Sequence, residues 1–72
     1  MEIKCNDYKT KDIIRMMRDC TEETQAKFAK SIQKGRDWCA KIEGGNSNII
    51  LEDFIKLANN YNIEIIMKKT DK

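Results

Sequence analysis

The residues of this chain that could perform covalent or metal chemistry are few and widely spaced. The 72 residues include three cysteines and no histidine. Cys5, Cys20 and Cys39 form no CxxC pair and have no histidine to complete a zinc site, so we expect them to be reduced and to act mainly as small apolar residues. Ser31 and Ser47 have no general base near them in the sequence, and no glycine-rich phosphate loop is present. The sequence therefore predicts a protein that is not an enzyme and binds no metal or cofactor.

The remaining chemistry is hydrogen bonding by charged side chains. The basic side chains that could take part are concentrated in the middle of the chain. The basic residues there are Lys27, Lys30, Lys34, Arg36 and Lys41. Acidic residues offset part of this charge, and the net charge of +2 permits an anionic partner without requiring one. With 40% hydrophobic and 36% charged residues, the chain is typical of a globular domain. It contains neither an apolar run of about 18 residues nor a secretory signal, so we expect a cytoplasmic protein.

Apolar spacing predicts the helices that position these charged groups. Periods near 3.6 predict helices over residues 10–20, 25–32, 36–43 and 51–60. Their apolar residues are Ile13, Ile14, Met17 and Cys20 in the first; Phe28, Ala29 and Ile32 in the second; Cys39 and Ile42 in the third; and Leu51, Phe54, Ile55, Leu57, Ala58 and Tyr61 in the fourth.

Capping residues mark the ends of these helices. Thr10 and Thr24 are expected N-caps of the first two, and Gly35 is an acceptable N-cap of the third. Gly44 and Gly45 stop the third helix, and Asn60 or Asn62 ends the fourth in a left-handed conformation.

The two ends of the chain alternate apolar and polar residues. "MEIKC" indicates a strand or a loose arm within residues 1–9. "IEIIMKK" has the β-branched content and the period of two of a strand, expected over residues 62–69, and residues 70–72 follow as a tail. We therefore expect one domain over residues 1–72 with its helical core at residues 10–61.

Two short helices joined by a tight turn, with a third packed behind them, form a helix-turn-helix. In that motif the first helix of the pair crosses the DNA backbone and the second inserts its N-terminal residues into the major groove. The stretch "TQAKFAKSIQKGRDWCAKIEGGNSN" fits this arrangement, with the second helix of the pair beginning at Arg36.

The sequence resembles the lambda-repressor-like, xenobiotic-response-element (XRE) family of helix-turn-helix domains from about Ile14 to Ile63. "TQA" followed by "FA" is similar to the family's opening of the second helix, and "AKIEGGNSNIILEDFIKLANNYNI" to its run from the third helix through the fourth. The resemblance implies an all-α fold of four to five helices. It also implies that Gln25 binds backbone phosphate, and that Arg18 forms an ion pair with Glu43.

The sequence departs from the family at the turn. Gln33 stands where glycine is usual, Lys34 where an apolar residue is usual, and Gly35 where serine or threonine caps the third helix. Glu23 also replaces a position that is often apolar. The turn therefore departs further from the family's pattern than its flanks do.

The reader residues are expected on the third helix. Arg36 can donate two hydrogen bonds to guanine, although a phosphate contact or a solvated position is the plainer interpretation. Asp37 can accept from cytosine, hold the rotamer of Arg36, or interact favourably with the helix dipole. Trp38 packs half-buried, contacts a thymine methyl group, or anchors a protein partner. Lys41 reaches a base or a phosphate, or is a surface lysine.

Phosphate contacts are expected around the reader helix, at Gln25 and Lys34 and in the loop after the helix. This loop offers small side chains and free amides at Gly45, Asn46, Ser47 and Asn48, with an ordinary surface loop as the alternative.

A single strand is unstable unless it pairs. The predicted C-terminal strand, with Ile63, Ile65, Ile66 and Met67, pairs either with "MEIKC" or with a second chain, and the resemblance favours a dimer.

Together these features predict a dimeric, sequence-specific DNA-binding regulator, a repressor that occupies a palindromic operator on double-stranded DNA. The alternative is a protein-interaction module, such as an antitoxin that binds a toxin or a mobile-element inhibitor. A purely structural dimerisation unit is a weaker alternative.

Overall fold

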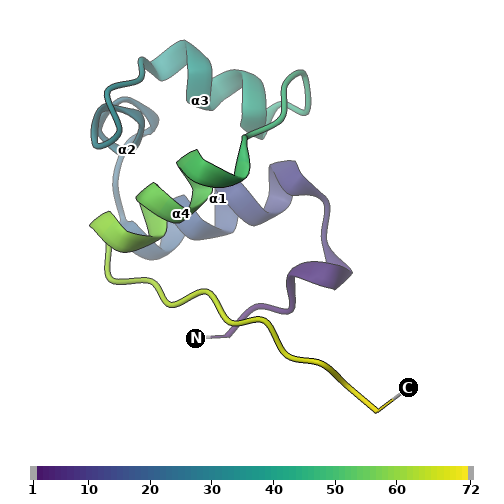
Figure 1. The fold of residues 1–72 in the computed structure, drawn as a ribbon. Helices are drawn as coiled ribbons and strands as arrows, with labels where there is room; N and C mark the ends of the chain where they lie inside the picture. The colour runs from purple at the N-terminus through teal and green to yellow at the C-terminus, as the bar shows by residue number, and fades with distance from the viewer. Residues whose placement is uncertain (1, 72) are drawn as a thin grey trace.

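The chain folds into helices throughout its central part. The computed structural model describes residues 2–71; Met1 of the expected arm and Lys72 of the expected tail lie outside the described residues. The elements are a 3-10 helix η1 (Cys5–Asp7) and the α-helices α1 (Thr10–Thr21), α2 (Gln25–Lys30), α3 (Arg36–Glu43) and α4 (Leu51–Asn60) (Figure 1). The prediction of an all-helical core is confirmed. No helix among residues 2–71 has the length and apolar content of a membrane span.

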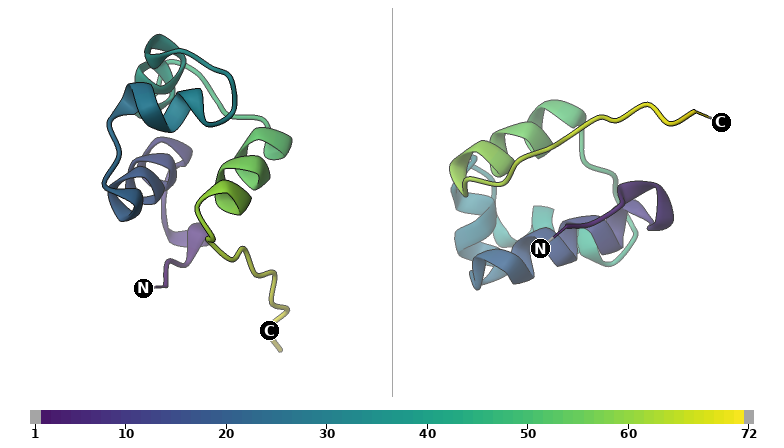
Figure 2. Two further views of the ribbon diagram at one scale, coloured as in Figure 1. Left: turned by 90° about the vertical axis from the view of Figure 1, so that its left-hand side faces the viewer. Right: turned by 90° about the horizontal axis from the view of Figure 1, so that it is seen from below.

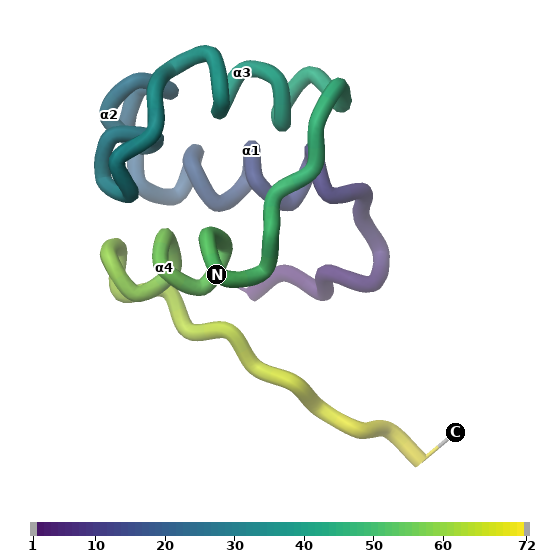
Figure 3. Tube along the Cα trace, turned by 45° about the horizontal axis from the view of Figure 1, so that its top comes forward, coloured from purple at the N-terminus to yellow at the C-terminus, as the bar shows by residue number. Residues whose placement is uncertain are grey.

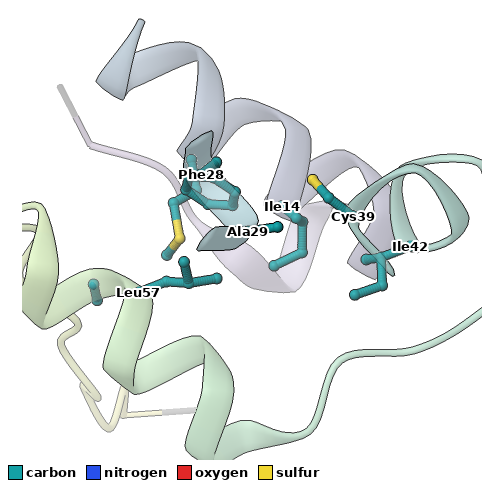
Figure 4. Close-up of a cluster of buried hydrophobic side chains, with 8 residues drawn as sticks. Ile14, Phe28, Ala29, Cys39, Ile42 and Leu57 are labelled. Atoms are coloured by element: carbon teal, nitrogen blue, oxygen red, sulfur yellow. The ribbon is translucent and has the colours of Figure 1, made fainter. Parts of the chain in front are cut away.

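The helices form two layers. α2 and α3 lie together over α1 and α4, which run beside each other (Figure 2). Each α-helix contributes two residues to the buried core: Ile14 and Met17, Phe28 and Ala29, Cys39 and Ile42, Leu57 and Ala58 (Figure 4). Phe28 also stacks on Tyr61, with ring centroids 5.6 Å apart, which joins α2 to the end of α4.

Three residues of the predicted apolar faces lie at the surface instead. Cys20, Leu51 and Ile55 are exposed. A helix turns about 100° per residue, so Thr21 lies closer than Cys20 to the face that carries Ile14 and Met17, and Thr21 is half-buried. In α4 the same geometry directs Leu57 and Ala58 inward, and Leu51 and Ile55 remain outside the core.

Every α-helix is followed by a residue in the left-handed conformation. These residues are Glu22, Gln33, Gly45 and Asn62, with φ values of 60°, 62°, 81° and 56°. The expected stop at Gly44 and Gly45 is confirmed, and Asn62 rather than Asn60 terminates α4. At the other ends, Thr24 caps α2 as predicted, because its Oγ1 accepts from the Lys27 N–H at 3.2 Å. The predicted N-cap of α1 is wrong by one residue: Thr10 is the first residue of the helix, and Lys9 is the N-cap.

The C-terminal strand expected at residues 62–69 is not formed. No β-ladder occurs among residues 2–71, and residues 63–71 run as extended chain away from the helices (Figures 1 and 3). The physical reason is that a strand needs a neighbour for its N–H and C=O groups, and a helical core offers no strand edge. The N-terminal segment provides no such edge either, since it contains η1 rather than a strand.

Candidate nucleic-acid interface

α2 and α3 are joined by a turn held at several points. After α2 the N–H of Lys34 donates to the Ala29 carbonyl at 3.0 Å, and that of Gln33 to the Lys30 carbonyl at 2.9 Å. These two bonds around a left-handed Gln33 are a Schellman motif, although Gln33 is not the usual glycine. α2 ends at Lys30, two residues before the end predicted at residue 32. Ile32 therefore lies in the turn, where it still packs against the core.

α4 fastens the same turn from the other side. The Asn60 Nδ2 donates to the Ser31 carbonyl at 2.9 Å, and the Ser31 Oγ donates to the Phe28 carbonyl at 2.8 Å. Carbonyl groups at a helix end lack partners within the helix, and here α4 supplies one. The unusual turn residues are therefore accommodated in a defined geometry.

α3 has one buried face and one exposed face. Cys39 and Ile42 are fully buried, whereas Arg36, Asp37 and Lys41 are exposed. The helix therefore presents these charged residues to solvent. α3 lies next to α2 in the layer above α1 and α4 (Figures 1 and 2). Trp38 is half-buried and packs against the core, as expected for the first of its three interpretations.

Arg36 and Asp37 form an ion pair with each other. The Arg36 Nη2 lies 3.6 Å from the Asp37 Oδ1, and the side chains are 64% and 86% exposed. A pair this exposed contributes little to stability. It leaves both groups available to a ligand.

A polar cluster fixes α3 against α1, and the predicted Arg18–Glu43 ion pair lies at its centre. The Arg18 Nε donates to the Glu43 Oε2 at 2.7 Å, and the Arg18 Nη2 donates to the Oε1 at 2.9 Å. The side chains are 19% and 7% exposed, so this two-bond pair is largely shielded from water. The Arg18 Nη1 also donates to the Glu23 carbonyl at 3.0 Å, which joins the segment between α1 and α2 to the cluster.

Two further donors complete the shell of Glu43. The Gln25 Nε2 donates to the Oε1 at 3.3 Å, and the Cys39 thiol donates to the Oε2 at 3.1 Å. Gln25 was expected to bind phosphate, but its side-chain amide is directed at Glu43 from the first turn of α2. We call Arg18, Gln25, Cys39 and Glu43 the clamp; it joins α1, α2 and α3 at one carboxylate.

The clamp shifts the pKa of three of its members. Burial would raise the pKa of Glu43, but the hydrogen bonds from Arg18, Cys39 and Gln25 outweigh this effect and the net shift is downward. The hydrogen bond to Glu43 raises the pKa of Arg18. Burial, and then the hydrogen bond to Glu43, raise the pKa of the Cys39 thiol to about 12. Glu43 is thus ionised and Cys39 protonated at neutral pH, so Cys39 is no nucleophile.

The loop after α3 lies beside the start of α1. Tyr8, Lys9 and Lys11 line one side of an open cavity, and Gly44, Gly45, Ser47 and Asn48 line the other. A Cβ at Gly45 would lie 3.3 Å from the Lys11 Cδ, and φ is positive there, so glycine suits this position on both counts. Sequence reasoning missed Lys9 and Lys11, although the cationic run "YKTK" was a signal for them.

The expected site residues thus fall into separate groups. Arg36, Asp37 and Lys41 share the exposed side of α3, and Lys34 is exposed just before it. Residues 45–48 are exposed at the far end of the same helix, whereas Gln25 belongs to the clamp. Ile63, Ile65, Ile66 and Met67 lie on the extended C-terminal segment. No group of three or more potential metal ligands occurs among residues 2–71.

Comparison of the chain with known protein families, with curated proteins and with solved structures gave no match. Its function is therefore inferred from the geometry and charge of its own residues.

Proposed function

We propose that this protein is a sequence-specific DNA-binding regulator of the XRE type, which represses transcription by occupying a palindromic operator as a dimer. The observation that carries the proposal is the orientation of α3. Its buried face is fixed by Cys39 and Ile42, and its first residues, Arg36 and Asp37, are exposed to solvent. A helix held in this way can enter the major groove with its N-terminal side chains against base edges.

Base recognition is assigned to Arg36, Asp37 and Lys41. The Arg36 guanidinium donates two hydrogen bonds to a guanine, and the exposed carboxylate of Asp37 accepts from a cytosine. Lys41 lies one turn after Asp37 and reaches the next base or a phosphate. Trp38 is half-buried and packs against the core, and the part of its side chain that remains accessible is offered to a thymine methyl group.

Phosphate contacts flank the reader helix. Lys34 precedes α3, and the amides and small side chains of residues 45–48 follow it, with Lys9 and Lys11 across the cavity. We retain Gln25 as a phosphate contact at the first turn of α2, where its side chain is half-buried and can hydrogen-bond a ligand while it supports Glu43. Such contacts fix the protein on the duplex without reading sequence.

Dimerisation provides the specificity that one small module lacks. A twofold dimer places two reader helices about one DNA turn apart, which a palindromic operator matches. We assign the dimer contact to the C-terminal segment with Ile63, Ile65, Ile66 and Met67, which has no strand partner within the described chain.

The decisive experiment is selection from random DNA duplexes at two salt concentrations, followed by sequencing of the bound fraction. We expect a palindrome to be enriched at both, with weaker binding at high salt because phosphate contacts release counterions. The matched control is Arg36→Ala, which should lose preference at one base pair of each half-site. A flat selection profile for the parent protein would contradict the proposal.

A protein-interaction module is the second candidate, and two observations favour it. Asp37 places a highly exposed carboxylate on the helix that would approach phosphates. Ile50, the N-cap of α4, and Leu51, its first residue, are exposed apolar residues. If the selection is flat, an antitoxin or mobile-element inhibitor becomes the better interpretation, with Trp38 and Asp37 in the contact.

A further inference from the structure

The C-terminal segment is extended and has no neighbouring strand among residues 2–71. The left-handed Asn62 ends α4, and the N–H of Ile63 donates to the Ala58 carbonyl at 2.8 Å, which fixes where the segment leaves the helices. Beyond that point Ile65, Ile66 and Met67 are 45%, 70% and 100% exposed. The segment runs away from the helical body (Figures 1 and 3). An extended segment with exposed apolar side chains and unpaired backbone groups is a template for another strand.

We propose that residues 63–69 of two copies of this chain pair as antiparallel strands about a twofold axis at Ile66. This inference rests on the proposed dimer and specifies its contact. A twofold axis perpendicular to the sheet places residue i of one strand opposite residue 132 minus i of the other. Glu64 then faces Lys68 of the second copy, and Ile65 faces Met67. Because of the symmetry, each of these pairs occurs twice.

Charge complementarity selects this register over its neighbours. A parallel, in-register pair would set Glu64 against Glu64 and Lys68 against Lys68, and like charges directly opposite each other are unfavourable. An antiparallel pair centred on Ile65 would place Glu64 opposite Ile66. One centred on Met67 would place Ile66 opposite Lys68. Of these arrangements, only the register at Ile66 pairs Glu64 with Lys68 and also places Ile65, Ile66 and Met67 opposite apolar residues, with Ile63 opposite Lys69 at the ends of the paired segment.

The two faces of the paired strands differ in composition. Ile63, Ile65 and Met67 share one face because side chains alternate along a strand. Ile63 packs against the helical core, whereas Ile65 and Met67 lie beyond it, are exposed in the single chain, and would be covered by the second copy. On the other face the two Ile66 side chains meet at the axis, and a Glu64–Lys68 pair lies on each side of them.

Disulfide trapping tests the register. In a background with Cys5→Ser and Cys20→Ser, which removes the two exposed thiols and keeps the buried Cys39, single cysteines are introduced and oxidised mildly. Directly opposite residues have Cα atoms about 4.5–5.5 Å apart, within disulfide range, whereas diagonal neighbours are about 7–8 Å apart. We expect Ile66→Cys to cross-link with itself. Ile65→Cys and Met67→Cys should cross-link only when the two variants are mixed.

Charge exchange tests the same contact without cysteines. Sedimentation equilibrium should give a dimer dissociation constant about tenfold higher for Glu64→Lys and for Lys68→Glu, because both symmetric pairs then repel. The variant with both changes should return to within about threefold of the parent. Lys69→Glu is the matched control: it makes the same charge change opposite Ile63 and should have a smaller effect than Lys68→Glu.

The outcomes separate this inference from the proposed function. The most efficient self-cross-linking at Ile65→Cys or Met67→Cys would overturn the register, and a monomer in sedimentation would overturn the dimer contact. If the cross-links follow the expected pattern but no duplex is enriched by selection, the strand pairing stands and the DNA-binding function falls. If a palindrome is enriched but the cross-links do not follow the pattern, the function stands and the pairing is wrong.

Discussion

Removing Arg18 from the clamp should lower the free energy of unfolding by an amount that can be worked out from the burial and hydrogen bonds of the Arg18–Glu43 pair. Arg18→Met removes the guanidinium but keeps much of the side-chain volume. It leaves the Glu43 carboxylate, 7% exposed, with only the weaker donors of Gln25 and Cys39. Removing one partner of a buried ion pair destabilises a protein by about 3–5 kcal/mol. Since the Arg18 side chain is 19% exposed and water can partly replace it, we expect about 3 kcal/mol.

That loss is large for so small a protein. At about 0.05–0.15 kcal/mol per residue, 72 residues correspond to roughly 4–11 kcal/mol of total stability. Urea unfolding of Arg18→Met should therefore show a much lower midpoint with an unchanged slope. Because the double replacement leaves no buried charge, Arg18→Met with Glu43→Met should be more stable than the sum of the two single effects by about 2 kcal/mol.

The pH dependence of unfolding measures independently how much the Glu43 carboxylate contributes to folding stability. The pKa of Glu43 is lowered in the folded protein from its ordinary value of 4.5. Its contribution is therefore fully present above pH 4.5 and is lost as the pH falls through the lowered pKa. We expect unfolding curves of Glu43→Met to lose this part of the acid dependence.

A surface ion pair provides the control. Lys56 lies 3.4 Å from Glu52 on α4, and both side chains are more than half exposed. Lys56→Met should change the unfolding free energy by no more than about 0.5 kcal/mol. If Arg18→Met costs as little as Lys56→Met, or if the two clamp changes simply add, the clamp does not hold α3 and the reasoning is refuted.

The other predictions concern the turn after α2, the exposed residues of α3 and the buried thiol. Gln33→Gly should raise stability by about 1 kcal/mol in urea unfolding, because Gln33 has a φ of 62° where glycine carries no steric cost; an unchanged or lower midpoint would contradict this. Arg36→Ala should cost about 1–3 kcal/mol for the selected operator and little for random duplexes, as measured by fluorescence anisotropy, whereas Gln25→Ala should weaken binding to all duplexes similarly. Cys39, buried and with a pKa of about 12, should resist a thiol reagent under native conditions while Cys5 and Cys20 are modified, as counted by mass spectrometry.

The sequence by itself determined the helices. The apolar spacing and the capping residues act within a few positions of the chain, so they identified α1, α3 and α4 almost to the residue. Asn62 and Gly45 were recognisable as helix stops for the same reason. The family resemblance also led to the Arg18–Glu43 pair, which no local pattern predicts.

The tertiary structure decided which groups meet and which remain exposed. Nothing local to Gln25 or Cys39 indicates that both hydrogen-bond Glu43, because their approach depends on how α2 and α3 pack on α1. The exposure of Cys20 likewise depends on the rotation of α1 in the bundle. The predicted strand failed for a related reason. Alternation fixes the side-chain period of a segment, but a strand also needs a hydrogen-bonding neighbour, and the helical fold of one chain provides none.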